Sequence, residues 1–253
     1  MTNGLDLLVM IDKAVKPYPN PAVFLSGGLD STIVLHHLAH QTKEPIHTYT
    51  AYWNHNKDET KYAKAVAEHY DTIHHNVEIK HIFKQFQKLL PKLDKPRINL
   101  WTSLLFEAAV KDGCETIYIG EGSDEHFDGY WYKPPVTPQE SWHGLLEYSL
   151  PTYRQLAEIY GVRLETPLVY LDLRITLPYR DIKNHDKTFL RLIYQDQLPK
   201  TVINRRKQPG RVPWLDLWEQ EAAPYILGEK PSTRPEAHQL INKWAYKEWL
   251  KKR

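Results

Sequence analysis

Residues 22–38 have the sequence AVFLSGGLDSTIVLHHL. A short apolar run at 22–25 leads directly into a serine- and glycine-rich turn, and apolar residues at helical spacing follow from Ser31. Glycines allow a backbone to approach an oxyanion closely, and the free N–H groups of a first helical turn point at that anion. The pattern therefore predicts a phosphate-binding turn between a strand and a helix, in which Ser26 and Ser31 add hydroxyl donors.

The carboxylate of Asp30 stands in the middle of this predicted phosphate loop. It would repel a phosphate unless a cation such as Mg²⁺ lay between them, so it indicates a metal–nucleotide complex. The alternative is a simple bend in which Asp30 or Ser31 caps the helix. We favour the phosphate loop because strand, serine, paired glycines, acid, serine and helix follow in register. The loop is not of the Walker type, since no Gly-Lys-Ser/Thr follows.

The chain around this turn alternates short apolar runs with helical patterns, which is typical of a parallel sheet covered by helices. The expected strands lie at 22–25, 46–53, 75–79 and 116–119, and the expected helices at 31–40, 58–70, 82–90 and 102–112. Beyond Tyr130 the pattern changes to proline-rich loops and mixed helical stretches, and a terminal helix that docks on the domain is expected at 235–253. The predicted fold is α/β, a helix-flanked parallel sheet that binds a nucleotide, with a mostly helical C-terminal part.

The composition of the 253 residues is that of an ordinary globular protein, with 42% hydrophobic and 25% charged residues. A single cysteine excludes a disulfide framework, and a formal net charge of +2 disfavours nucleic acid as a partner. The sequence holds no apolar run long enough to span a bilayer, and its start is too acidic and interrupted for a secretory signal. We therefore expect a cytoplasmic protein.

A second glycine-rich and acidic turn, GEGSDEHFDGY, occupies residues 120–130 and follows the expected strand at 116–119. Open α/β sheets bind ligands at the carboxyl ends of their strands. Four acids at such a place repel one another, so the turn is either a solvated surface turn or a site supplied with cations. Beside Asp30, Asp124 would be a natural second Mg²⁺ ligand.

The SGGLDS turn resembles the phosphate loop of the N-type ATP pyrophosphatases, and GEGSDEHFDGY is closely similar to the GEGSDE-x-F-x-G-Y segment of asparagine synthetases. The segments NKDETKYAKAVAEHY and LPKTVINRRKQPGRVPW also resemble that family, so the likeness covers roughly residues 5–219. The chain is identified as a synthetase domain of this family. We expect one domain over residues 1–253, with a nucleotide-binding core at 1–130 and a substrate-side part at 131–253.

The resemblance implies an enzyme that uses ATP and Mg²⁺ to adenylate a carboxylate substrate, releases pyrophosphate, and transfers an amine or ammonia to form an amide and AMP. It implies that Glu121 handles protons of the incoming amine and that Lys207 steadies negative charge on the phosphoryl and acyl groups. The other implied residues hold the pyrophosphate portion (Ser26, Gly27, Gly28, Ser31), border the adenosine (Leu25, Ala51, Gly120) or bind Mg²⁺ (Asp30, Asp124).

Two departures from the family pattern concern the nitrogen source and the carboxylate substrate. The phosphate loop arrives by Ser26, which leaves no room for the usual glutaminase domain, so free ammonia, an amine substrate or a separate amidase subunit remain alternatives. Arg163 and Glu165 reverse the family's order of charges, which makes aspartate doubtful and leaves room for a larger or differently charged carboxylate. Arg97 is a candidate clamp for it, because arginine binds carboxylates bidentately.

Two other functions stay open at this point. The domain could be a non-catalytic ATP-binding subunit of a larger amidotransferase complex, or an amidase that modifies nucleic acid. The oligomeric state is also open. His36 and His40 lie one helical turn apart, but without a third ligand we expect them to be structural rather than zinc-binding, and we expect the same of Cys114.

Overall fold

A computed structural model describes residues 4–53, 60–97, 99–127, 129, 137–171, 186–206, 212–222, 225–226 and 230–251. The chain forms two compact units. The first comprises Met1–Glu78 and Leu105–Gln208, and the second comprises Ile79–Leu104 and Pro209–Arg253. The expected assignment of the whole chain to one domain stays a prediction. No helix in the described part is long and apolar enough to cross a membrane.

The first unit is built on a five-stranded sheet in which every neighbouring pair of strands is parallel. The strands are β1 (Pro21–Phe24), β2 (His47–Tyr52), β3 (Ile73–Glu78), β4 (Thr116–Tyr118) and β5 (Arg163–Glu165). Their order across the sheet is β3-β2-β1-β4-β5. The chain adds β2 and β3 on one side of β1 and then returns to add β4 and β5 on the other side. The topological switch point of the sheet therefore lies between β1 and β4.

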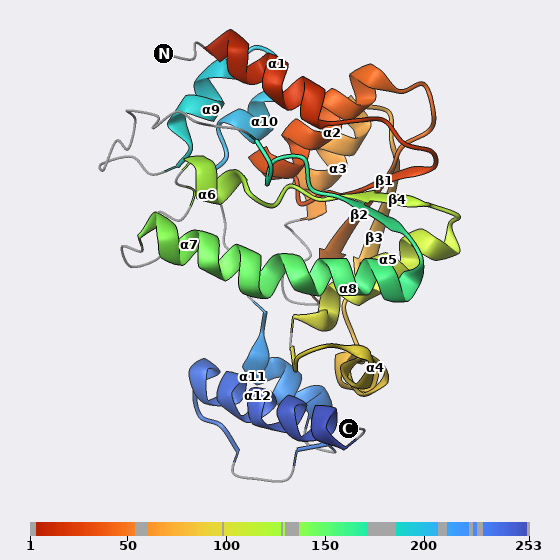
Figure 1. Ribbon diagram of the computed structural model, residues 1–253, viewed down its shortest axis with the longest axis vertical. Helices are drawn as coiled ribbons and strands as arrows, with labels where there is room; N and C mark the ends of the chain where they lie inside the picture. Colours follow the sequence, from red (N-terminus) through yellow and green to blue (C-terminus); the bar gives the residue numbers. More distant parts are fainter. Residues whose placement is uncertain are drawn as a thin grey trace. The chain divides into compact units, whose positions relative to one another are not determined.

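Helices cover both faces of this sheet (Figure 1). The helical segments of the first unit are α1 (Gly4–Ala14), α2 (Leu29–Gln41), α3 (Thr60–His69), most of α5 (Ser103–Lys111), α6 (Ser123–Phe127), α7 (Pro138–Gly144), η4 (Leu145–Ser149), α8 (Leu150–Tyr160), α9 (Thr188–Ile193) and α10 (Lys200–Ile203). The residue Val23 of β1 packs in one core with apolar side chains of α1, α2 and α3. On the other face, Phe24 meets Phe106 of α5 edge to face, with ring centroids 5.1 Å apart.

The second unit consists of α4 (Ile82–Leu89), η2 (Leu90–Lys92), η3 (Leu100–Thr102), α11 (Trp214–Leu217), η5 (Trp218–Ala222) and α12 (Arg234–Leu250). Trp244 of α12 packs on Phe83 of α4, with ring centroids 5.2 Å apart. The carboxylate of Glu221 accepts hydrogen bonds from the first N–H groups of α4, which have no partner within the helix. The expected terminal helix is therefore present, and it packs on α4 within this unit.

The predicted fold class is confirmed, and the four expected strands lie within about two residues of their predicted bounds. The main difference is β5, which the sequence did not indicate as a strand. It is only three residues long and two of them are charged, so the periodicity that marks longer strands is missing. Its register is fixed by pairing with β4.

Candidate active site

The candidate site lies where β1 and β4 end, at the switch point of the sheet. The turn after β1 begins at Leu25, and the turn after β4 contains Gly120. Because both strands run in the same direction, their two turns emerge at the same edge. This is the place where open α/β sheets bind ligands.

Internal hydrogen bonds hold the first turn. The Ser26 hydroxyl accepts from the N–H of Gly28 at 3.2 Å and lies 3.1 Å from the hydroxyl of Ser31. Gly27 has a φ of +66°, and a Cβ there would lie 2.4 Å from the backbone nitrogen of Ala63 on α3. Only glycine satisfies both the left-handed backbone and this close approach. The turn is therefore fixed against α3 as well as by its own hydroxyls.

The second turn lies directly against the first. A Cβ on Gly120 would lie 2.8 Å from the backbone nitrogen of Ser31 and 2.9 Å from the carbonyl carbon of Asp30. The turn is held from its other side, because Gly122 has a φ of +96° and a Cβ there would lie 2.6 Å from the Cα of Val169. The two sequence motifs, 90 residues apart, are thus in backbone contact.

Asp30 and Asp124 share one cation, the ammonium of Lys187. The Lys187 nitrogen donates a hydrogen bond to Asp30 Oδ1 at 2.5 Å and forms an ion pair with Asp124 Oδ1 at 2.6 Å. The Lys187 side chain is only 2% exposed, whereas the two carboxylates are 19% and 16% exposed. A buried ammonium needs charged partners, and these two aspartates supply them.

Gly129, the last glycine of the second motif, completes this arrangement. A Cβ at this position would lie 1.8 Å from Asp124 Oδ1 and 2.3 Å from the Cε of Lys187. Any side chain here would displace one of them, since neither distance allows a non-bonded contact. A side chain at this position would therefore require the Asp124 carboxylate or the Lys187 side chain to move away from its present place.

Arg205 connects the phosphate loop with α3. Its guanidinium lies 3.9 Å from the ring centroid of Tyr62 and donates to the carbonyl oxygens of Ser26, at 3.4 Å, and Gly27, at 3.2 Å. A planar guanidinium can stack on a ring and donate in its own plane at the same time, which an ammonium cannot do. Arg205 thus fixes the outer side of the loop.

The remaining expected site residues lie around these two turns or outside the described residues. Leu25 is buried, and its carbonyl accepts from the Thr50 hydroxyl at 2.5 Å, next to Ala51 on β2. Glu121 is partly buried. The pKa of Tyr153 on α8 is raised mainly by the burial of that tyrosine and further by the negative charge of Glu121. Lys207 lies outside the described residues.

The donor set fits the phosphate groups and the magnesium ion that the sequence implies. The hydroxyls of Ser26 and Ser31 lie 3.1 Å apart in the first turn, which also contains Gly27 and Gly28. Asp30 and Asp124 each direct one carboxylate oxygen at the same cation, the ammonium of Lys187. Carboxylate oxygens are ligands that Mg²⁺ prefers.

Four other residues named in the sequence analysis, Arg97, Arg163, Glu165 and His36, form hydrogen bonds or ion pairs with nearby side chains. Arg97, the candidate clamp, is buried in the second unit and pairs with Asp94 at 3.2 Å. Arg163 donates to Glu165 at 3.3 Å along β5. His36 is hydrogen-bonded to Tyr70. None of these arrangements identifies the carboxylate substrate.

Comparison with known proteins identifies the family. The sequence profile of the asparagine synthase family matches residues 15–165, which is more than half of the chain and includes both turns. This chain belongs to the asparagine synthase family. The match ends before Lys187 and Arg205, the two cations that hold the turns.

Several curated asparagine synthetases are similar to this asparagine synthase family chain. The glutamine-hydrolysing enzyme of Asparagus officinalis is 25% identical over 81% of this chain and 41% of its own length. Asparagine synthetase B of Escherichia coli is 24% identical over 83% and 45%. The chain thus spans less than half the length of these relatives. Solved structures with some likeness include the NH3-dependent NAD synthetase of Campylobacter jejuni (17% identity, 96% of this chain and 94% of that one, TM-score 0.43).

Three features of the site are not apparent from the sequence of this asparagine synthase family chain. They are the position of Lys187 between the two aspartates, the close packing of Gly129 and the contact of Arg205 with the first turn. Lys187 is 157 positions from Asp30, and nothing in its neighbourhood forms a recognisable motif. Arg205 stands in the basic run Arg205–Arg206–Lys207, which is also typical of a solvated surface. Gly129 was visible as part of the second motif, but its close approach depends on tertiary packing.

Proposed function

We propose that this protein is an ATP-dependent amide-bond synthetase that forms AMP and pyrophosphate. A substrate carboxylate attacks the α-phosphorus of ATP to give an acyl-adenylate, and an amine or ammonia then displaces AMP. Family membership supports the class of reaction. The observation that carries the proposal is the backbone contact between Gly120 and the Asp30–Ser31 turn, because it unites both motifs in one site.

In this proposal the first turn binds the phosphates. The hydroxyls of Ser26 and Ser31 and the backbone of Gly27 and Gly28 hold the pyrophosphate portion, and donors that are already oriented stabilise charge as it develops there. Leu25, Ala51 and Gly120 border the adenosine. Arg205 keeps the turn in place from outside the phosphate cradle.

Asp30 and Asp124 hold the magnesium ion. When bound, Mg²⁺ supplies positive charge beside the phosphates and so lowers the cost of charge transfer to the leaving pyrophosphate. Lys187 keeps the two carboxylates together before ATP arrives, since without a counter-charge they would repel each other. Glu121 then handles protons of the incoming amine, and Lys207 steadies charge on the reacting groups.

The experiment is pyrophosphate exchange with a panel of carboxylic acids in the presence of Mg²⁺ and ATP, with the nucleotide products separated by chromatography. We expect labelled pyrophosphate to enter ATP only with the correct acid, and AMP to accumulate when ammonia or an amine is added. Recovery of ADP and orthophosphate would refute the route. Tight ATP binding without exchange for any acid would favour the non-catalytic subunit instead.

Two variants distinguish a specific loss from damage to the fold. Asp124→Asn removes a charge from the shared cation site and should lower the exchange rate at least 100-fold, by analogy with the loss of one preorganised charge-stabilising group. Asp196→Asn is the matched control, since that side chain is 82% exposed in the same unit. Equal rates in the two variants would remove Asp124 from the metal site.

A further inference from the structure

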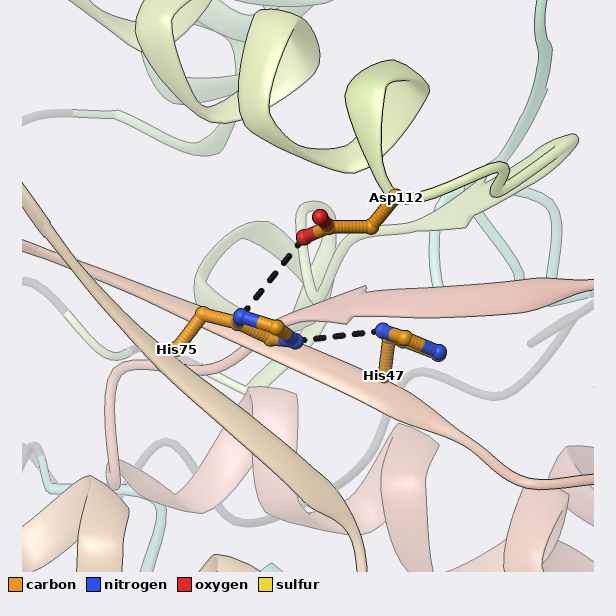
Figure 2. A group of neighbouring side chains, drawn as sticks. All are labelled: His47, His75 and Asp112. Carbon is orange, nitrogen blue, oxygen red and sulfur yellow. Dashed lines mark hydrogen bonds and ion pairs between the residues drawn. The ribbon is translucent and has the colours of Figure 1, made fainter.

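Three metal-ligating side chains gather in the first unit, away from the phosphate loop: His47, His75 and Asp112 (Figure 2). His47 is the first residue of β2, and Asp112 follows the end of α5 shortly before β4 begins. The group therefore stands toward the amino-terminal edge of the sheet, whereas the phosphate loop stands at the carboxyl edge. We propose that these three residues bind a divalent transition-metal ion of the Zn²⁺ class.

The sheet register brings the two imidazoles together. His47 and Tyr49 are two residues apart on β2 and so face the same side of the sheet. Tyr49 pairs with His75 on the neighbouring strand, which puts the His75 ring on that side too. The ring centroids of His47 and His75 are 5.3 Å apart. Both ligands are thus carried by paired backbone and keep their separation without help from a bound ion.

The separation of the nitrogen atoms suits a tetrahedral ion. His47 Nδ1 and His75 Nε2 are 3.1 Å apart. Two zinc–nitrogen bonds of about 2.05 Å at the tetrahedral angle put their nitrogens about 3.3 Å apart. The two rings lie within 9° of parallel, so a modest rotation of each is needed to turn both lone pairs toward one ion. One ligand atom from each of the three residues falls within 4.8 Å of the others.

The third ligand can make up the remaining distance. Asp112 Oδ2 lies 3.5 Å from His75 Nδ1, the ring nitrogen that does not face His47, so the carboxylate, whose side chain is 33% exposed at the end of a helix, has to turn toward Nε2 to join the ion. The hydroxyl of Tyr49 donates to the same oxygen at 2.8 Å. A hydrogen bond of this kind from a buried group is typical of carboxylates that bind metals, because it orients the ligand. Tyr49 therefore orients the Asp112 carboxylate beside the His75 ring.

The donor types of the group also favour a metal ion. Two imidazoles and one carboxylate favour Zn²⁺, Co²⁺ or Ni²⁺ over Mg²⁺. A fourth coordination position would be open to water, since His75 and Asp112 are each about one-third exposed.

The competing interpretation is a chain of hydrogen bonds with no metal, running from Asp112 through His75 to His47. Titration of the metal-stripped protein with Co²⁺, followed by visible absorption, distinguishes the two. Excess Mg²⁺ is kept present so that Asp30 and Asp124 do not bind cobalt. We expect one equivalent of Co²⁺ with a tetrahedral spectrum, displaced by Zn²⁺. Absence of that spectrum in the wild-type protein would overturn the proposal.

Variants then locate the ion. Asp112→Asn keeps an oxygen that accepts from Tyr49, and His75→Asn removes an imidazole; each should weaken Co²⁺ binding about 10- to 100-fold or more, the range seen for altered metal surroundings. His81→Asn is the control, because His81 is exposed and its left-handed backbone suits asparagine. Should His75→Asn fail to fold by circular dichroism, Asp112→Asn decides. Unchanged affinity in Asp112→Asn would exclude the proposed ligand set.

Discussion

Lys187 donates a hydrogen bond of 2.5 Å to Asp30, a residue 157 positions earlier in the chain. The same ammonium forms an ion pair with Asp124, so a lysine stands between the two carboxylates that the sequence assigns to magnesium. This arrangement gives the site a counter-charge before any nucleotide arrives. It also means that a divalent ion must compete with Lys187 for the same oxygens, which makes the competition measurable.

Replacement of Lys187 by methionine should destabilise the protein and at the same time improve its affinity for a divalent ion. Removal of the ammonium leaves two carboxylates facing each other, and loss of one partner from a buried ionic group costs about 3 kcal/mol. Urea denaturation with and without Mg²⁺ measures both effects, because an ion that binds only the folded state restores stability. Lys200→Met, at a side chain 70% exposed, is the control. Equal midpoints for both variants would contradict the prediction.

Gly129→Ala should disrupt the same pair by steric contact rather than by charge. Its methyl group would stand 1.8 Å from Asp124 Oδ1, so the carboxylate has to move. We expect a loss of about 1 to 3 kcal/mol of stability, as for other overpacked sites, together with loss of pyrophosphate exchange. Gly144→Ala is a matched control in helical backbone with open space around the Cβ, and it should be neutral or slightly stabilising. Wild-type exchange in Gly129→Ala would show that the packing is not needed.

The sequence predicted the parts of this structure that depend on local pattern. Residues 22–38 predicted a strand, a turn and a helix, and the structure has β1, a turn and α2 there. The rule that open α/β sheets bind ligands at the carboxyl ends of their strands predicted that the two turns lie together, and Gly120 does lie against the backbone of Asp30. Lys187 and the pairing of His47 with His75 could not be predicted, because each depends on packing or register between segments that no local pattern connects.

Arg205→Lys should weaken ATP binding while leaving the fold intact. Lysine keeps the positive charge but cannot stack on Tyr62 and donate to two carbonyls of the phosphate loop together. We expect the KM for ATP to rise about tenfold, which corresponds to about 1.4 kcal/mol, with little change in kcat. The neighbouring exposed Arg206 gives the control variant Arg206→Lys. A fall in kcat with an unchanged KM would contradict a role in positioning the loop.

Stability should decrease as the pH is lowered from about 6.5 to 4, and His36 should account for part of the decrease. Burial, with the neighbouring His37 and His40, lowers the pKa of His36 from 6.5 to about 4. Between these values the unfolded chain binds a proton that the folded chain does not, so acid favours unfolding. In His36→Asn the slope of unfolding free energy against pH should be shallower in this range, as measured by urea denaturation at several pH values. The exposed His143→Asn should keep the wild-type slope; a wild-type slope in both variants would exclude His36.

Gly27→Ala tests whether the phosphate loop needs glycine for its backbone angle alone or also for its approach to α3. Gly27 and Gly161 have nearly the same φ, +66° and +69°, but a Cβ at Gly27 would lie 2.4 Å from the Ala63 nitrogen, whereas one at Gly161 meets open space. Gly161→Ala should therefore cost only the left-handed conformation, about 1 kcal/mol, and leave exchange unchanged. Gly27→Ala should cost more and also abolish ATP binding, since the turn must move away from α3. Equal losses of stability, with ATP binding retained, would show that α3 does not position the loop.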